Sequence, residues 1–179
     1  MRQPFMLLVL LIILPLTVSF SQMNMPDQIT QAIAVLQPTK GNNVHGVILF
    51  TKSSSGDETQ VTGDITGLTP GRHGIHIHMF GDLSSEDGKS AGDHFNPMKK
   101  HHGAPGAQDH HAGDLGNIIA DSSGKAHIDM KLSMIMLSGV NSIIGRSVVV
   151  HAGVDDLKSQ PAGNSGPRIA VGVIGIAKK

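Results

Sequence analysis

Cysteine is absent from this chain of 179 residues. No disulfide can therefore tie one loop to another, and no thiolate can bind a metal or act as a nucleophile. Any metal site would have to be built from other side chains, chiefly histidines and carboxylates.

Tryptophan and tyrosine are absent too, and aromatic residues make up 3% of the chain. The 14 basic residues balance the 14 acidic ones, and they form no basic patch. Because nucleic-acid binding relies on basic patches and stacking aromatics, the sequence predicts no nucleic-acid partner. The 22 glycines indicate many turns, which is typical of short strands joined by loops.

A long hydrophobic run is also lacking. The longest one, from Phe5 to Leu16, follows Arg2 and is too short to cross a bilayer as a helix. Small residues around Ser19 and Ser21 suit cleavage before Gln22. We therefore expect residues 1–21 to be a secretory signal peptide and residues 22–179 to form one secreted, extracellular domain without stable membrane association. The alternative is an uncleaved membrane anchor.

Histidine, in contrast, is concentrated in one stretch. Eight of the eleven histidines fall between residues 73 and 111. A bound metal is the commonest cause of such a cluster.

Two of these histidines lie in a predicted strand. His76 and His78 alternate with Ile75 and Ile77, so both imidazoles point to one face of the strand and can reach one ion. His151 ends another apolar run, 147–151, and can reach the same ion from a neighbouring strand. A site of imidazoles alone suits copper.

A second group lies in a segment rich in glycine, proline, aspartate and asparagine, which predicts a long loop over residues 81–113. It consists of His94, His102, His111 and Asp114. Three imidazoles and one carboxylate make a tetrahedral zinc site, and a bound cation would compensate for the entropy of ordering the loop. We interpret four of the other five histidines as surface residues or neighbours of ligands: His45, His101, His110 and His127.

The apolar patterns and turn signals predict eight short strands and no helix, and therefore an all-β sandwich or barrel. The predicted strands are residues 27–36, 46–50, 59–65, 73–80, 114–120, 126–132, 147–151 and 169–177.

Several motifs together resemble those of the copper/zinc superoxide dismutase family. The likeness extends from about Ile33 to the C-terminus. The matching segments are residues 74–78, 91–97, 111–117, 143–151, 163–170 and 172–177. The resemblance implies an eight-stranded antiparallel Greek-key barrel with long metal-binding and active-site loops. It also implies that superoxide is converted to oxygen and hydrogen peroxide.

The resemblance also implies roles for particular residues. Copper would be held by His76, His78, His94 and His151, and zinc by His94, His102, His111 and Asp114. His94 would bridge the two ions and act catalytically by carrying a proton. Asp155 would link a copper histidine to a zinc histidine, and Arg168 would act catalytically by binding the superoxide anion. His73 would brace the fold without being a ligand.

The chain departs from the family at two places. Val171 stands where the family has a strand cysteine, and the missing loop partner falls within residues 86–89, so we expect the metals to contribute more to order here. The segment from Asp155 to Arg168 is short and lacks the charged residues that usually surround the copper mouth. We therefore expect superoxide dismutase activity with an altered salt dependence.

The resemblance implies a homodimer, because Gly81, Ile144, Gly145 and Ile176 match the family's apolar dimer contact; the alternative is a monomer. A competing hypothesis for function is a non-enzymatic copper/zinc-binding or buffering protein on the same fold. The presence of all seven ligand positions and of Arg168 favours the enzyme. A zinc hydrolase is disfavoured, because no positioned carboxylate base accompanies an open zinc site.

Overall fold

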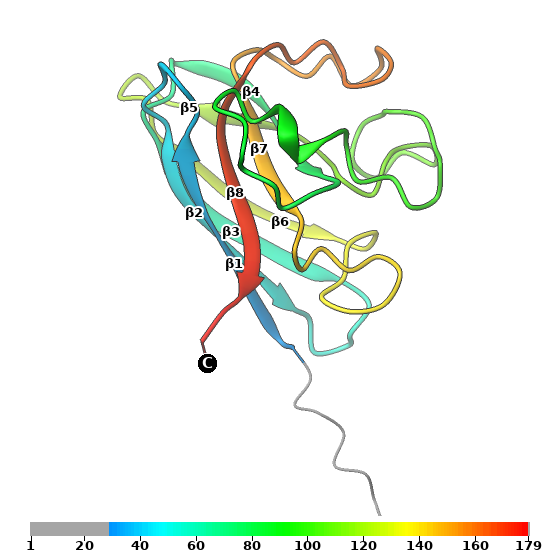
Figure 1. Ribbon diagram of the computed structural model, residues 1–179. Helices are drawn as coiled ribbons and strands as arrows, with labels where there is room; N and C mark the ends of the chain where they lie inside the picture. Colours follow the sequence, from blue (N-terminus) through cyan, green and yellow to red (C-terminus); the bar gives the residue numbers. More distant parts are fainter. Residues whose placement is uncertain (1–28, 179) are drawn as a thin grey trace, which may run out of the picture.

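The computed structural model describes residues 29–178 (Figure 1). The expected signal peptide, residues 1–21, and its cleavage position lie outside the described residues. Within the described range, no helix is long and apolar enough to cross a membrane.

The described chain forms eight β-strands, as the sequence predicted, and one short 3-10 helix in the loop before β5. The first strand begins at Gln31 rather than at residue 27; Ile29 and Thr30 precede it without joining the sheet. The elements are β1 (Gln31–Pro38), β2 (His45–Lys52), β3 (Thr59–Thr66), β4 (Gly71–His78), η1 (Lys89–Ala91), β5 (Asp114–Ala120), β6 (Ala126–Leu132), β7 (Ser147–His151) and β8 (Arg168–Ile176).

All paired strands are antiparallel, and they follow the order β5-β4-β7-β8-β1-β2-β3-β6 in one sheet. The strands at the two ends of this order, β5 and β6, contact each other, so the sheet curls into a nearly closed barrel (Figure 1). Because β3 pairs with β6 and β4 with β7, the connections are of the Greek-key type. The predicted all-β barrel is confirmed.

The fourth strand is buried on both of its faces. Ile75 and Ile77 belong to the barrel core, whereas His76 and His78 point to the opposite face and are equally buried. Burial of the second face requires a cover outside the barrel. That cover consists of long loops rather than a second sheet.

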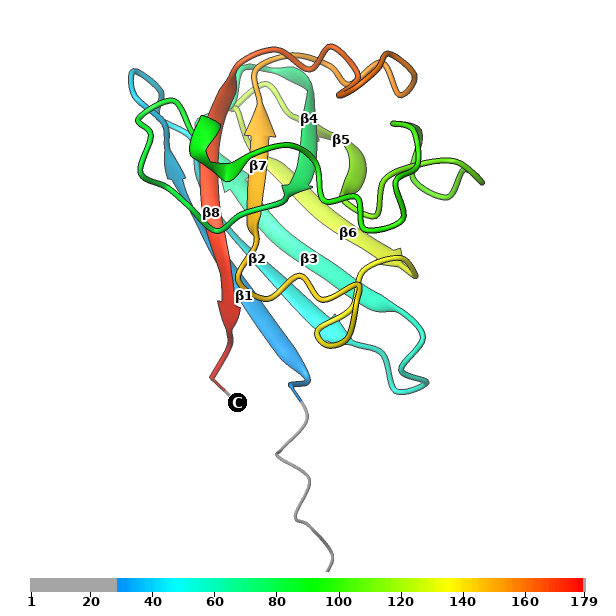
Figure 2. The ribbon, with the colours of Figure 1, turned by 45° about the vertical axis from the view of Figure 1, so that its right-hand side comes forward.

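Two long loops provide this cover. The metal loop (residues 79–113) joins β4 to β5, and the 152–167 loop joins β7 to β8. Figure 2 shows the green metal loop passing across β8 and β7, with the orange 152–167 loop at one end of the same strands. The two loops thus meet over the outer face of β4 and β7, where the histidines lie.

The predicted fourth strand extended to Phe80, but the observed one ends at His78. The N–H groups of Met79 and Phe80 donate to the loop carbonyls of Asp93 at 2.8 Å and Ala91 at 3.0 Å. The metal loop therefore folds back along the end of β4 and replaces a neighbouring strand there.

Candidate metal centre

Strand pairing brings together the histidines of β4 and β7. His76 lies opposite Val149 in the ladder, and His78 lies opposite Ser147. His151 follows Val149 by two residues, so its side chain points to the same outer face as His76. The sequence prediction that these three imidazoles share one face is confirmed by their placement.

The metal loop delivers His94 to this group. Phe95, buried in the barrel core, exchanges backbone hydrogen bonds with Ile77 at 2.8 Å and Gly113 at 2.9 Å. A local bridge also pairs His94 with His78. Burial of the Phe95 ring therefore fixes the adjacent imidazole against β4.

The first set of candidate ligands consists of histidines alone. Their ligand nitrogens lie within 4.8 Å of one another, and all four residues are buried: His76, His78, His94 and His151. One nitrogen on each ring has no hydrogen-bond partner: Nδ1 of His76 and Nε2 of the other three. A buried polar atom left unpaired costs about 1–3 kcal/mol, so four of them at one point need a common partner. A bound copper ion fits this arrangement.

The opposite nitrogen of each ring is held by the protein. His78 donates from Nδ1 to the carbonyl of Gly92 at 2.8 Å, and His151 donates from Nδ1 to the carbonyl of Gly166 at 2.9 Å. These bonds fix the tautomer, so that Nε2 is left with a free lone pair. The backbone thus orients two of the rings before any metal is present.

The second set centres on one carboxylate oxygen, Oδ1 of Asp114. His94 Nδ1 lies 2.7 Å from it, His102 Nδ1 lies 3.0 Å away and His111 Nδ1 lies 3.2 Å away. The His102 nitrogen is not aligned for a hydrogen bond, although it is buried. All four ligand atoms lie within 4.8 Å of one another, which suits a tetrahedral zinc ion.

Asp155 lies between the two sets. Its Oδ2 is 2.8 Å from His76 Nε2 and its Oδ1 is 2.9 Å from His102 Nε2, and all three side chains are fully buried. Asn117 on β5 clasps the Asp155 backbone, accepting from its N–H at 2.8 Å and donating to its carbonyl at 2.9 Å. A Cβ at Gly163, where φ is +65°, would collide with the Asp155 carboxylate, so glycine is required there.

Burial keeps the histidines of the first set neutral. It lowers the pKa of His78 well below its usual value, with a further contribution from the neighbouring His94. It also lowers the pKa of His151 to about 3 and that of His94 to about 4, although Asp114 opposes the effect at His94. Neutral imidazole is the form that ligates metals, so this environment favours metal binding at neutral pH.

The second set contains a histidine with the opposite behaviour. Burial disfavours the charge on His102, but the neighbouring carboxylates of Asp114 and Asp155 outweigh it and raise the pKa of His102 to about 9. Burial likewise would raise the carboxyl pKa values of Asp114 and Asp155, but hydrogen bonds from the histidines hold both well below the usual range. A metal ion binding there must displace the proton from His102 Nδ1.

Arg168 reaches the edge of the four-histidine set from β8. Its Nη1 donates to the carbonyl of Gly88 and its Nη2 donates to the carbonyl of Gly92, both at 2.7 Å. The carbonyl of Gly92 also accepts from His78. Together with His78 and His151, Arg168 lines a hollow of about 440 Å³ that is open to solvent.

Non-covalent contacts hold the metal loop around Val171, the position at which the resemblance implies a disulfide. Val171 packs with Ala91 and Val149 in a small buried cluster beneath the loop. Beside this cluster, the Arg168 guanidinium donates to the metal-loop carbonyls of Gly88 and Gly92, and the Thr39 hydroxyl holds the Arg168 backbone by donating to its carbonyl at 2.7 Å. Apolar packing and the Arg168 hydrogen bonds therefore fasten the loop to the barrel.

A second fastening lies at the surface. The N–H of Lys40 donates to the carbonyl of Glu86 at 2.8 Å, and the two side chains form an exposed ion pair. Exposed pairs of this kind contribute little to stability, so the backbone bond is the firmer link.

The remaining histidines lie apart from both sets, as the sequence interpretation expected. His73 is buried and bonds through Nδ1 to the carbonyl of His151, 2.9 Å away. His101 pairs with Asp109 at the surface, and His127 pairs with Asp64. His45 and His110 belong to neither set.

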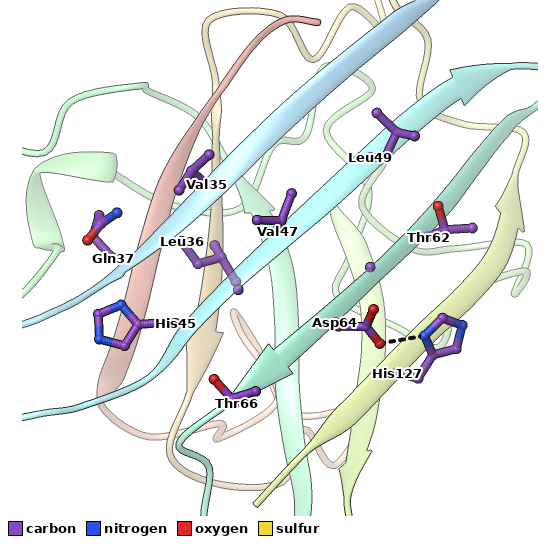
Figure 3. A pocket seen from close by; sticks show the side chains of 12 residues that line it. Val35, Leu36, Gln37, His45, Val47, Leu49, Thr62, Asp64, Thr66 and His127 are labelled. Carbon is purple, nitrogen blue, oxygen red and sulfur yellow. Dashed lines mark hydrogen bonds and ion pairs between the residues drawn. The ribbon is translucent and has the colours of Figure 1, made fainter.

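A larger hollow, of about 670 Å³, lies on the outer face of β1, β2, β3 and β6 (Figure 3). Val35, Val47 and Leu49 line one part of it, and the Asp64–His127 pair lines another. None of the candidate metal ligands lines this groove. Its residues offer no converging ligand atoms, so the metal centre lies in the smaller hollow.

Sequence reasoning did not identify several supporting groups. Gln160 accepts from the His102 N–H at 2.8 Å and donates to the His102 carbonyl at 2.9 Å, which joins the two loops. Asn117 and Thr39 were missed as well. The carbonyls of Gly92 and Gly166 leave no signal, because backbone acceptors exist at every residue.

Comparisons with known proteins agree with this geometry. A family model described as copper/zinc superoxide dismutase matches residues 44–174. The chain is 47% identical to superoxide dismutase (Cu-Zn) 2 of Mesembryanthemum crystallinum over 154 residues, or 83% of this chain and 96% of that protein. It is 48% identical to superoxide dismutase (Cu-Zn) of Onchocerca volvulus over 156 residues, or 82% of this chain and 96% of that protein.

Two further likenesses concern location and shape. The chain is 46% identical to extracellular superoxide dismutase (Cu-Zn) of Brugia pahangi over 155 residues, or 82% of this chain and 76% of that protein. The crystal structure of the clock protein EA4 matches with a TM-score of 0.79 at 43% identity, covering 87% of this chain and all of that one. The chain therefore belongs to the copper/zinc superoxide dismutase family, whose members are enzymes that use copper and zinc.

Proposed function

We propose that this enzyme disproportionates superoxide to oxygen and hydrogen peroxide at a copper site that His94 shares with a zinc site. The supporting observation is the orientation of the His94 ring. Its Nε2 is unpartnered within the four-histidine set, and its Nδ1 lies 2.7 Å from Asp114 Oδ1 in the other set. One imidazole thus faces both ligand groups.

The ligand assignment follows from the unpartnered nitrogens. Copper would be held by His76 Nδ1 and by Nε2 of His78, His94 and His151. Zinc would be held by Nδ1 of His94, His102 and His111 and by Asp114 Oδ1. Asp155 would orient His76 and His102 together, so that the two sites are mechanically coupled.

Bound copper would supply one-electron exchange with superoxide, and bound zinc would supply a second positive charge on the His94 ring. Two superoxide anions and two protons give one oxygen and one hydrogen peroxide, so a proton donor is needed beside the reacting oxygen. His94 Nε2 is the candidate, because it is unpartnered in the described chain and the other nitrogen of its ring faces the second ligand set. It can carry a proton only while it does not ligate copper, and in that state it would donate to the peroxide that forms in the hollow.

Arg168 would bind and orient the superoxide anion. Two carbonyls fix its guanidinium at the edge of the hollow, and its charge attracts a small anion toward the histidines. The Arg168→Ala variant should keep both metals and lose most of its activity. The Arg168→Lys variant keeps a positive charge and should lose less.

The direct test is superoxide removal by copper- and zinc-loaded protein, compared with the His151→Ala variant. We expect this variant to keep zinc, to lose copper and to lose activity by at least about 10²-fold. A protein that only buffers metals would bind both ions in the wild type and remove no superoxide. That result would overturn the proposal.

We further propose that the protein is secreted after cleavage before Gln22. The apolar run and small residues of 1–21 support this, as does the likeness to a relative named extracellular. N-terminal sequencing of protein from the culture medium should begin at Gln22. Secreted material that begins at Met1 would contradict cleavage.

We propose a homodimer through the face formed by Gly81, Ile144, Gly145 and Ile176. Ile176 is 63% exposed, although it is apolar. Light scattering should give twice the monomer mass, and the Ile176→Lys variant should give the monomer. Ile119 is 69% exposed on β5, so Ile119→Lys is a matched control that should stay dimeric.

A further inference from the structure

The entrance to the metal centre is wide in relation to superoxide. The hollow above His78, His94 and His151 measures about 440 Å³, which is far more than a diatomic anion fills. Phosphate and sulfate therefore fit as well, and a guanidinium binds these anions readily. Size cannot exclude them, so any discrimination must come from charge.

Apart from histidines, the described residues that line this hollow include two charged side chains of opposite sign. Arg168 carries the positive charge, and Asp93, on the metal loop, carries the negative one. Lys158, on the 152–167 loop, is exposed and does not line the hollow. The net charge that these two side chains present to an entering anion is therefore close to zero.

The carboxylate of Asp93 is not neutralised by a neighbour. Its side chain is exposed and makes no hydrogen bond or ion pair within the described chain, whereas Asp87 pairs with Lys89 at 2.8 Å. The Asp93 carbonyl accepts from Met79 N–H at 2.8 Å, which fixes the residue at the rim beside His94. Its negative charge therefore lies at the lining of the hollow, and no hydrogen bond or ion pair of the described chain neutralises it.

Asp93 also acts on Arg168 at a distance. Burial lowers the pKa of Arg168, and the negative charge of Asp93, followed by that of Asp87, acts in the opposite direction. No direct ion pair joins Asp93 and Arg168, so the arginine stays available to an anion. The carboxylate and the guanidinium therefore act on an entering anion independently.

We propose that Asp93 is a specificity-determining residue that favours a small monovalent anion over divalent phosphate or sulfate at the copper mouth. Coulomb repulsion grows with the charge of the ligand, so a fixed carboxylate penalises a dianion twice as strongly as a monoanion. Arg168 attracts both classes, and Asp93 reduces the binding of the larger, more highly charged one. The inference rests on the proposed function, because it assumes that superoxide enters through this hollow.

The test uses copper- and zinc-loaded protein and two probe anions. Azide serves as the monovalent probe, and its affinity is followed by optical titration of the copper band. Inorganic phosphate at pH 8 serves as the divalent probe, and its affinity is obtained from competition with azide. The variant is Asp93→Asn, and Asp93→Glu keeps the charge as a rescue.

Asp57→Asn is the matched control, because it changes the net charge by the same amount in the β2–β3 turn, at the opposite end of the barrel from the 152–167 loop (Figure 2). We expect Asp93→Asn to raise azide affinity about twofold and phosphate affinity about fourfold at low salt, as Coulomb's law in water gives for charges about 10 Å apart. Both gains should shrink as salt is added. Asp57→Asn and Asp93→Glu should leave both affinities near the wild-type values.

Equal effects of Asp93→Asn on azide and phosphate, or effects no larger than those of Asp57→Asn, would overturn the inference. Superoxide removal by the same samples distinguishes failure of this inference from failure of the proposed function. If the wild type binds azide but removes no superoxide, the proposed function fails. In that case, the azide and phosphate affinities still test whether Asp93 makes the hollow selective.

Discussion

The two ligand sets share one histidine but are built differently. His76, His78 and His151 lie on paired strands of the barrel, whereas His102 and His111 lie in a long loop. The strand rings are held by backbone carbonyls or by a carboxylate already fixed to β5, whereas the loop histidines depend on Asp114 and, for His102, on two residues of another loop, Asp155 and Gln160. We therefore expect a bound cation to order the loop set more than the strand set.

The two ligand sets also differ in the protonation of their histidines. Burial lowers the pKa of His78 and His151, so these rings are neutral without any metal. Two neighbouring carboxylates outweigh burial and raise the pKa of His102 to about 9, so a proton occupies the loop set when no cation does. With the proposed ligand assignment, zinc would replace a proton in a network of charged groups, whereas copper would bind a group of unpartnered lone pairs.

Metal removal should give the largest effect, and it should affect the loop set more than the strand set. Chelation of both ions should lower the melting temperature by at least about 10 °C, because ligands that bind only the folded state stabilise it. Hydrogen exchange should increase most in residues 99–113 and least in β4 and β7. The measurements are calorimetry and hydrogen exchange with and without metals. A melting temperature that barely changes would mean that the loop is ordered by the protein alone.

Acid should destabilise the metal-free protein through the four-histidine set. His94 and His151 have folded pKa values of about 4 and about 3, below the unfolded value of 6.5. As pH falls below 6.5 the unfolded chain takes up protons that the folded chain does not, so stability falls. His94 alone would contribute a loss on the order of 2–3 kcal/mol by pH 4.

The raised pKa of His102 has the opposite effect on stability, and it acts in a different pH range. Its raised pKa contributes stability that is complete below pH 6.5 and is lost as pH rises toward 9. Urea unfolding of metal-free protein from pH 4 to 9 measures both the loss of stability toward pH 4 and the loss toward pH 9. A free energy of unfolding that stays constant between pH 6.5 and 4 would contradict the burial of neutral imidazoles in the four-histidine set.

The Asp155→Asn variant should weaken zinc more than copper. An amide can still accept from one histidine, but it cannot accept from both, and His102 has fewer other supports than His76 on its strand. Loss of such a supporting carboxylate typically lowers metal affinity by about 10- to 100-fold. Metal competition titrations measure this for each ion. Asp156→Asn, next to it in the same loop, is the control and should leave both affinities close to normal.

The smallest effect should come from the hydrogen bond that holds the backbone of Arg168, whose guanidinium binds the metal loop. Thr39→Val removes the buried hydroxyl that donates to the Arg168 carbonyl, and should cost about 1–2 kcal/mol in the free energy of unfolding. Thr59→Val is a matched control, because the equally buried Thr59 hydroxyl donates to the Ile135 carbonyl at 2.8 Å, away from the loop. Both variants should lose stability, but only Thr39→Val should also lose azide affinity.

Much of the fold was predictable because strands leave a periodic signal. The alternation of Ile75 and Ile77 with His76 and His78 specified both a strand and a shared face, and the structure confirms the strand. The end of β4 was not predictable. The apolar pattern continues to Phe80, whereas the backbone of Met79 and Phe80 pairs with a loop that is distant in sequence.

The candidate site was predictable where side chains carry the chemistry. All seven proposed ligands were named from histidine clustering and family motifs, and the structure places them in two groups. The positions of Asn117, Gln160 and Thr39 could not be predicted. Their partners are backbone atoms of other segments, and such contacts depend on how the loops meet in space rather than on any local pattern.

The apolar cluster of Val171, Ala91 and Val149 has a consequence for how this protein matures. A covalent tie at this position would make assembly depend on an oxidant and on the redox poise of the surrounding compartment. Here the loop can dock by packing alone, so folding proceeds equally in reducing and oxidising surroundings. Reductants that break disulfides should leave the folding of the metal-free protein unchanged, because the chain has no cysteine.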